Sequence, residues 1–137
     1  MKAYDDCIVF LLAKAYQKAH SQLKKRLSPY GLTPIQSLIL ADLWGEDGIS
    51  ASEIGKRLTL DPATLSGVVD RMISGGWIGK ISDPEDKRIH RIFLTEKSKT
   101  LQPDILAERN QANEDVLEQM NVEEKMLFKR LLREVQK

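Results

Sequence analysis

The stretch Ser82-Asp-Pro-Glu-Asp-Lys-Arg-Ile-His-Arg-Ile-Phe-Leu-Thr95 decides how this chain folds. Ile92 and Leu94 share one face of an extended segment, as period-two alternation requires, so the stretch predicts a β-strand rising from a turn. Trp77-Ile-Gly-Lys-Ile81 predicts its partner strand. The turn between them is polar and ends in charged residues, Asp86, Lys87 and Arg88. A charged hairpin that follows a run of short helices predicts contact with a nucleic-acid duplex.

Composition limits the class of protein. A chain of 137 residues is long enough for one domain, or for a small domain with added dimerisation helices. At 42% hydrophobic and 30% charged residues it resembles a soluble globular protein. No stretch approaches the ~18 consecutive apolar residues that span a bilayer, and residues 1–12 lack the basic start of a signal peptide. A single cysteine fits a reducing compartment, so we expect a cytoplasmic protein without membrane contact.

The net charge of +1 is low for a protein that binds nucleic acid. The segment 50–95 is also nearly balanced between acidic and basic residues. If the chain binds DNA, its fold must sort the basic side chains onto one face.

Helix signals precede the hairpin. Apolar residues at i, i+4 and i+7 spacing predict a helix over 4–28. Capping sequences then open three shorter helices: Thr33-Pro-Ile-Gln36 begins one that runs to about Trp44, Ser50-Ala-Ser-Glu53 begins one that runs to about Leu58, and Asp61-Pro62 begins one that ends at Gly75-Gly76.

Two helices follow the hairpin. Thr95 caps the first, which runs to about Met120, and Pro103 either kinks it or separates its first turn. Asn121 caps the last helix. The expected fold is mainly α with a small β-hairpin wing, a winged helix-turn-helix with dimerisation helices at both ends. We therefore predict a DNA-binding domain over 33–95 and a helical dimerisation region over 1–32 and 96–137.

The terminal helices carry wide apolar stripes that the central module is too small to cover. Their burial against a second copy of the chain predicts a homodimer. The alternative is that they pack on their own domain.

Several segments together resemble the MarR family of bacterial transcription regulators. They are Gly31-Leu-Thr-Pro-Ile-Gln36, Ile54-Gly-Lys-Arg-Leu58, Thr64-Leu-Ser-Gly-Val-Val-Asp-Arg-Met72, Gly76-Trp-Ile78 and the wing sequence from Asp83 to Thr95. Lys80 and Ser98 depart from the family, which more often has Arg and Gly there. The resemblance implies a dimeric, sequence-specific DNA-binding regulator of the repressor type. We expect it to respond to a small ligand and to need no cofactor.

In such a fold the second helix of the motif, here from Pro62 to about Ser74, enters the major groove. Its apolar residues, Leu65, Val68, Val69 and Met72, should face the core. The opposite face is short-chained and weakly basic, and its candidate DNA contacts are Pro62, Thr64, Ser66, Gly67 and Arg71. Thr64 and Ser66 can bond base edges or phosphates, Gly67 allows close approach, and Arg71 can reach a phosphate or a guanine. The alternative is a solvated surface, or for Arg71 an ion pair with a carboxylate of the wing.

The wing supplies the sharper prediction. An Arg at a hairpin tip suits a narrow minor groove, so we expect Arg88 to enter one, with Asp86 holding it in place. Lys87, His90 and Arg91 are candidate phosphate contacts, although His90 shares a strand face with Ile92 and can instead cover the core edge. A symmetric dimer predicts a pseudo-palindromic double-stranded operator with half-sites about one helical turn apart.

The resemblance also implies a sensed signal. Candidates for a ligand site are Tyr16, His20, Tyr30 and Trp44, each of which can instead be an ordinary packed side chain. Cys7 suggests a redox-sensing alternative, because a helix start favours a thiolate. Asp5 and Asp6 oppose it, because nearby carboxylates raise a thiol pKa.

Other classes compete less well. A winged-helix protein-interaction module is the alternative to DNA binding, and the balanced charge is its best support. The sequence contains no nucleophile–base pair and no phosphate loop, so we do not expect an enzyme. His20 and His90 lack a partner at metal-ligand spacing, so we expect no metal site.

Overall fold

The computed structural model describes residues 1–137, which divide into two compact units. The reading unit is Leu27–Ala107, and the terminal unit comprises Met1–Arg26 with Glu108–Lys137. Two long helices, α1 (Ile8–Leu27) and α5 (Glu96–Val116), run across the boundaries between them. The functional domain boundaries expected at residues 33 and 95 stay a prediction.

Three helices of the reading unit begin at caps that the sequence predicts. They are α2 (Pro34–Gly45), α3 (Ala51–Leu58) and α4 (Pro62–Ser74). Thr33 and Gln36 form the reciprocal capping box at α2, and the Asp61 carboxylate accepts the Thr64 backbone N–H at α4. At α3 only half of the expected box forms: the Ser50 side chain accepts from the Glu53 backbone, while the Glu53 carboxylate bonds Arg57 instead.

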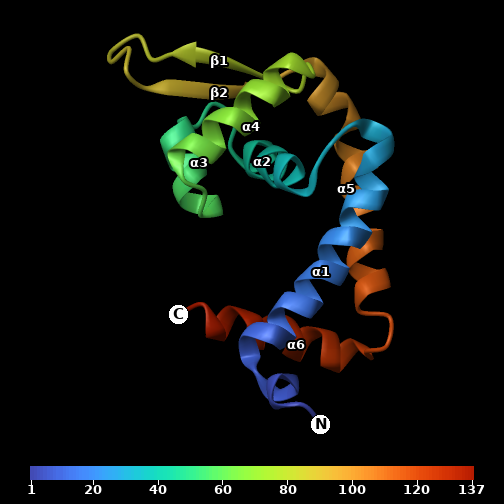
Figure 1. The fold of residues 1–137 in the computed structure, drawn as a ribbon. Coiled ribbons are helices and arrows are strands. Elements are labelled where there is room, and N and C mark those ends of the chain that lie inside the picture. The colour runs from blue at the N-terminus through green and yellow to red at the C-terminus, as the bar shows by residue number, and fades with distance from the viewer. The chain divides into compact units, whose positions relative to one another are not determined.

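A hairpin completes the reading unit (Figure 1). Strands β1 (Ile78–Ser82) and β2 (His90–Leu94) pair antiparallel, with Ile78 opposite Leu94 and Ser82 opposite His90. The segment between α2 and α3 joins the other edge of β2: the Gly48 N–H donates to the Ile92 carbonyl and the Ile92 N–H donates to the Ile49 carbonyl, both at 2.9 Å. The wing is therefore hydrogen-bonded to the helix-turn-helix through its inner strand.

Gly48 permits this close pairing. Its φ of +79° is left-handed, and a Cβ on it would lie 2.8 Å from the Phe93 ring. A larger residue at this turn would therefore both strain the backbone and displace Phe93.

The reading unit has a closed core. All four apolar residues expected on the inner face of α4 are buried, and the α2, α3 and β2 side chains Leu40, Ile54 and Ile92 are fully buried. The start of α5 belongs to this core. Ser98 is fully buried and its hydroxyl donates to the Trp77 carbonyl, while the Trp44 indole donates to the Ser98 carbonyl at 3.2 Å. Ser98 thus connects the start of α5 to Trp77, just before β1, and to Trp44 on α2.

The terminal unit contains most of α1, the second half of α5, and α6 (Val122–Val135). The helix expected from residue 4 begins only at Ile8, because Lys2 and Asp5 cap a short 3-10 turn, η1 (Ala3–Asp6), before it. A second 3-10 turn, η2 (Ser28–Tyr30), follows α1 in the reading unit. Helix α5 continues through Pro103 and ends at Val116, and not at Met120 as expected, because residues 117–120 form the turn into α6.

Ion pairs join the helices of the terminal unit. Arg26 on α1 binds Asp115 at 2.6 Å and Glu108 at 3.1 Å, both on α5. Lys125 on α6 binds Glu114 at 2.6 Å. The apolar stripes of α1 and α6 are nevertheless exposed, as Ile8, Val9, Tyr16, Val122, Met126 and Val135 illustrate. None of the helices is long and apolar enough to cross a membrane.

Candidate nucleic-acid interface

Helix α4 presents the short-chained face that the sequence predicts. Pro62, Thr64, Ser66, Asp70 and Arg71 are exposed, while Gly67 is half-buried. A Cβ on Gly67 would lie 3.4 Å from the Arg71 guanidinium, so this Arg lies back along its own helix over the glycine. Arg71 makes no ion pair with a wing carboxylate, and its charge remains available on the surface.

The Thr64 hydroxyl already has a partner. It donates to the Asp61 carboxylate at 2.8 Å, and the Thr64 backbone N–H donates to the same group at 2.9 Å. These two bonds hold the pKa of Asp61 below its usual value, and the backbone N–H bond contributes most. Because a hydroxyl has one proton to donate, Thr64 in this state can accept from a base but cannot donate to a phosphate.

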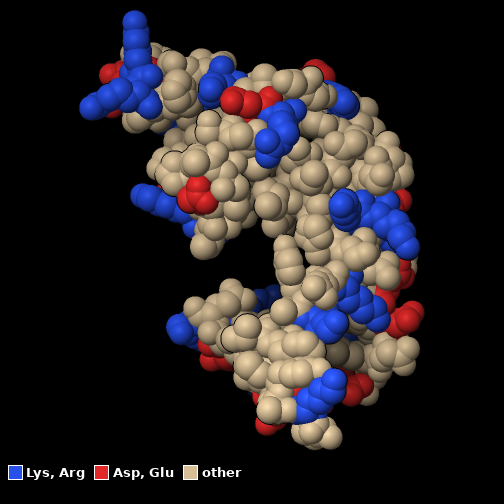
Figure 2. Space-filling model, in the orientation of Figure 1, with Lys and Arg blue, Asp and Glu red and all other residues tan.

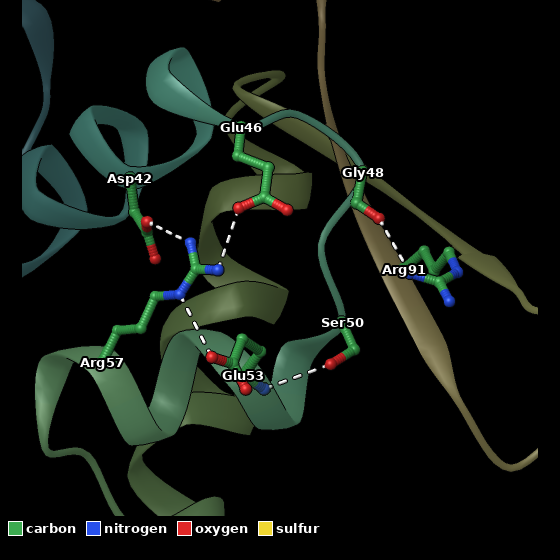
Figure 3. Close-up of polar contacts among 7 residues, drawn as sticks. All are labelled: Asp42, Glu46, Gly48, Ser50, Glu53, Arg57 and Arg91. Atoms are coloured by element: carbon green, nitrogen blue, oxygen red, sulfur yellow. Dashed lines mark hydrogen bonds and ion pairs between the residues drawn. The ribbon is translucent and has the colours of Figure 1, made fainter.

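Arg57 fixes α3 against the end of α2, a role that the sequence analysis did not assign (Figure 3). Its guanidinium donates to Glu46 at 2.9 Å, to Asp42 at 3.0 Å and to Glu53 at 3.2 Å. These hydrogen bonds raise the pKa of Arg57, and the bond to Glu46 contributes most to the shift. The Glu53–Arg57 spacing of four residues was the one local signal of this cluster. Through Asp42 and Glu46, Arg57 links α3 to the C-terminal end of α2.

The wing tip is a projecting basic feature of the reading unit. Figure 2 shows Lys and Arg side chains extending from the hairpin turn. Lys87 is exposed, and the Arg88 side chain is 91% exposed. Asp86 accepts from the Arg88 backbone at 3.0 Å, from Nε at 3.1 Å and from Nη2 at 3.0 Å. The pKa of the Asp86 carboxyl lies below its usual value, chiefly because the Arg88 side chain donates hydrogen bonds to it. Arg88 thus points outward from a carboxylate that bonds both its backbone and its side chain.

His90 and Arg91 lie in different settings. His90 is exposed and does not cover the core edge. Arg91 is half-buried: its Nε donates to Asp83 at 2.8 Å and its Nη1 donates to the Gly48 carbonyl at 3.3 Å. The guanidinium proposed from sequence as a phosphate contact is therefore already engaged with groups of the protein.

A largely apolar groove of about 580 Å³ lies between α3, α4 and the strands. Its polar lining residues include Ser52, Lys56, Ser66, Asp70, Lys80 and His90. Sequence reasoning missed this groove because its walls come from four separate elements.

The four ligand candidates divide between the two units. Tyr16 and His20 are neighbours on α1 in the terminal unit, with ring centroids 5.4 Å apart, and Tyr16 is 65% exposed. Tyr30 and Trp44 are half-buried in the reading unit. None of the four lines the groove.

Cys7 is exposed just before α1, and its carbonyl accepts the Leu11 N–H at 2.9 Å. It lies at the start of the helix, as expected, but not inside it. No group of three or more His, Cys, Asp or Glu side chains in the structure is placed to hold a metal ion.

Comparison with known proteins decides the family. The sequence model of the MarR family matches residues 32–90. The HTH-type transcriptional regulator TtmR of Methylorubrum extorquens is 39% identical over 93 residues, which are 68% of this chain and 46% of that relative. A probable transcriptional regulator from Pseudomonas aeruginosa has a TM-score of 0.90 at 27% identity, covering 96% of this chain and 98% of that one. The chain belongs to the MarR family of winged helix-turn-helix regulators.

A mutant MarR from E. coli, solved in complex with operator DNA, shares the fold: its TM-score is 0.88 at 24% identity, over 98% of this chain and 99% of that one. The winged helix-turn-helix predicted from sequence is thus confirmed. The matched MarR-type relatives are transcriptional regulators, which confirms that the chain is not an enzyme. The match with TtmR spans less than half of that relative's length.

Proposed function

We propose that the chain is a homodimeric repressor that binds a pseudo-palindromic operator and releases it in response to a small molecule. In this proposal α4 enters the major groove and the wing places Arg88 in the adjacent minor groove. Because operator DNA lies in the bacterial cytoplasm, the protein acts there.

The single observation that carries the DNA-binding role is the wing tip. Arg88 is almost fully exposed, and Asp86 bonds both its backbone and its side chain. Holding a long side chain in one extended pose before binding reduces the entropy lost on binding. The fold shared with an operator-bound MarR protein supports the same role.

The terminal unit supports a dimer. Most of its exposed large apolar side chains lie on α1 and α6, and they include Ile8, Val9, Leu11, Leu12, Val122, Met126, Leu127 and Leu131. Large apolar side chains exposed along two helices of one unit suggest a surface that a partner covers. We infer that a second copy of the chain covers this surface. The resulting dimer would place two reading units on the two half-sites of a palindrome.

The groove of the reading unit is a candidate site for the small molecule. Its apolar walls suit a planar ring, and the ammonium groups of Lys56 and Lys80 suit an acidic substituent. Ser66 and His90 line the groove and are also predicted DNA contacts, so an occupant would compete with DNA. Within the terminal unit, the neighbouring rings of Tyr16 and His20 are the second candidate location.

The Arg88→Ala variant tests the DNA-binding role. We expect it to weaken binding to operator duplex by about 5- to 150-fold, the range of one good Arg contact, without changing thermal unfolding. Binding is measured by fluorescence anisotropy at several salt concentrations, and Arg130→Ala on α6 serves as the control. Unchanged affinity would remove the wing from the interface. A complete absence of salt-sensitive DNA binding by the unaltered protein would favour the protein-interaction alternative.

A further inference from the structure

The strand register separates Arg91 from the groove. Ser82 pairs with His90, Ile81 with Arg91, and Lys80 with Ile92. Paired residues share a face of a sheet and successive residues alternate between faces. Lys80 and His90 therefore lie on the face that lines the groove beside α4, and Arg91 lies on the opposite face.

On that opposite face Arg91 joins two parts of the reading unit. Its Nη1 donates to the Gly48 carbonyl in the turn between α2 and α3, as Figure 3 shows. Its Nε donates to the Asp83 carboxylate at the base of the wing turn. Asp83 is the more enclosed partner, with 13% of its side chain exposed against 43% for Arg91. The pair thus links the helix-turn-helix to the wing through a protected carboxylate.

Asp83 passes this constraint to the wing turn. Its second carboxylate oxygen accepts the Glu85 N–H at 2.8 Å and the Asp86 N–H at 3.3 Å. Its own N–H donates to the Ile89 carbonyl at 2.8 Å, which closes the turn. Asp86, held at its backbone in this way, is the residue that holds Arg88.

We propose that Arg91 is a positioning residue of the wing, which acts through Asp83 and Asp86 to orient Arg88 relative to the helix-turn-helix. A phosphate contact by Arg91 would require its guanidinium to leave Asp83 and Gly48. The positioning role rests on the proposed function, because it gains meaning only if Arg88 binds DNA. The contacts within the wing turn can be tested without DNA.

The first test uses the free protein. Amide hydrogen exchange at residues 85–88 should quicken at least about threefold in Arg91→Ala, because the turn loses the cation that holds Asp83. Arg91→Lys should restore it only in part, since an ammonium cannot reproduce the two-sided contact. Lys80→Ala, a cation removed from the other sheet face, should leave this exchange unchanged. Unchanged exchange in Arg91→Ala would overturn the proposal, whatever the DNA-binding result.

The second test is a double-mutant cycle with Arg88→Ala, read by operator affinity. Arg91→Ala should weaken binding about three- to tenfold in the unaltered protein and less than about twofold when Arg88 is already Ala, because coupled residues are not additive. The salt dependence of Arg88→Ala should not change on adding Arg91→Ala. A direct phosphate contact would instead persist in the Arg88→Ala background and lower the logarithmic salt slope by about 0.9, which would overturn the proposal. If Arg88→Ala alone has no effect, the proposed function fails at the wing, and the exchange experiment still decides the role of Arg91.

Discussion

The two units of this chain differ in how completely they bury their apolar side chains. Every buried apolar side chain except Ala112 lies in the reading unit. In the terminal unit α1 and α6 leave large apolar side chains exposed, whereas the reading unit leaves only Leu38, Ile81 and Ile89. A unit with its own core can hold a binding surface in one shape by itself. A unit whose stripes are exposed depends on a partner, which makes it suited to setting the distance between two copies.

The largest effect should come from charging the apolar surface of the terminal unit. Met126 is 68% exposed in a single chain, so Met126→Glu should be tolerated by the monomer. In a symmetric dimer it would place two unpaired carboxylates in an apolar interface, and we expect dimerisation to weaken at least about 100-fold. Analytical ultracentrifugation checks this, with Glu123→Gln on the same helix as control. A dimer of unchanged affinity would mean that the dimer interface does not include this surface.

The next largest effect should distinguish the two units by stability. Ile54 is fully buried, so Ile54→Ala should lower the free energy of unfolding by about 2–5 kcal/mol. Ile8 is 63% exposed, so Ile8→Ala should change it by less than about 0.5 kcal/mol. Both variants are compared by urea unfolding in the Met126→Glu background, where a dimer does not contribute. Equal losses would contradict the contrast between the units.

Acid should loosen the wing only at low pH. The pKa of Asp83, lowered chiefly by Arg91, and that of Asp86, lowered chiefly by Arg88, lie below the usual 3.8. A carboxyl whose pKa is lowered by folding contributes stability above its unfolded pKa, and this is lost as pH falls through the folded pKa. We expect protection of the wing amides to stay level from about pH 8 to pH 5 and to fall below about pH 4. Asp83→Asn should show weaker protection at neutral pH and a smaller fall in acid, and an identical acid fall would contradict the assignment.

The smallest effect is expected at Cys7. The side chain is exposed, so Cys7→Ser should change the free energy of unfolding by less than about 0.5 kcal/mol. Treatment with hydrogen peroxide should leave operator affinity unchanged in both proteins. Loss of binding in the unaltered protein but not in Cys7→Ser would instead support the redox alternative.

The sequence predicts the features that depend on local chemistry. Thr33 with Gln36, Asp61 with Pro62 and Asn121 with Glu124 each place a helix start correctly, because an N-cap bonds within three residues. Strand alternation similarly locates β2 and its buried Ile92. Helix α1 begins later than the expected residue 4, because Lys2 and Asp5 close a 3-10 turn before it.

Contacts between distant residues account for what the sequence did not predict. Arg57 meets Asp42 across 15 positions, and Arg91 meets Gly48 across 43. Neither spacing has a local signature, so Arg91 resembles any exposed basic residue until the strands are paired. Its Asp83 partner is only eight positions away, but the two meet because the hairpin folds back. The groove was missed for the same reason.

Selection of bound sequences from a random pool of DNA duplexes tests most directly whether two reading units act together on DNA. We expect enrichment of a pseudo-palindrome whose half-sites lie about one helical turn, 10–10.5 base pairs, apart. Met126→Glu should lose the paired half-sites, and Arg88→Ala should relax selection at the flanking minor-groove positions. Recovery of no common sequence, or of a single unpaired half-site by the unaltered protein, would contradict a dimeric operator-binding regulator.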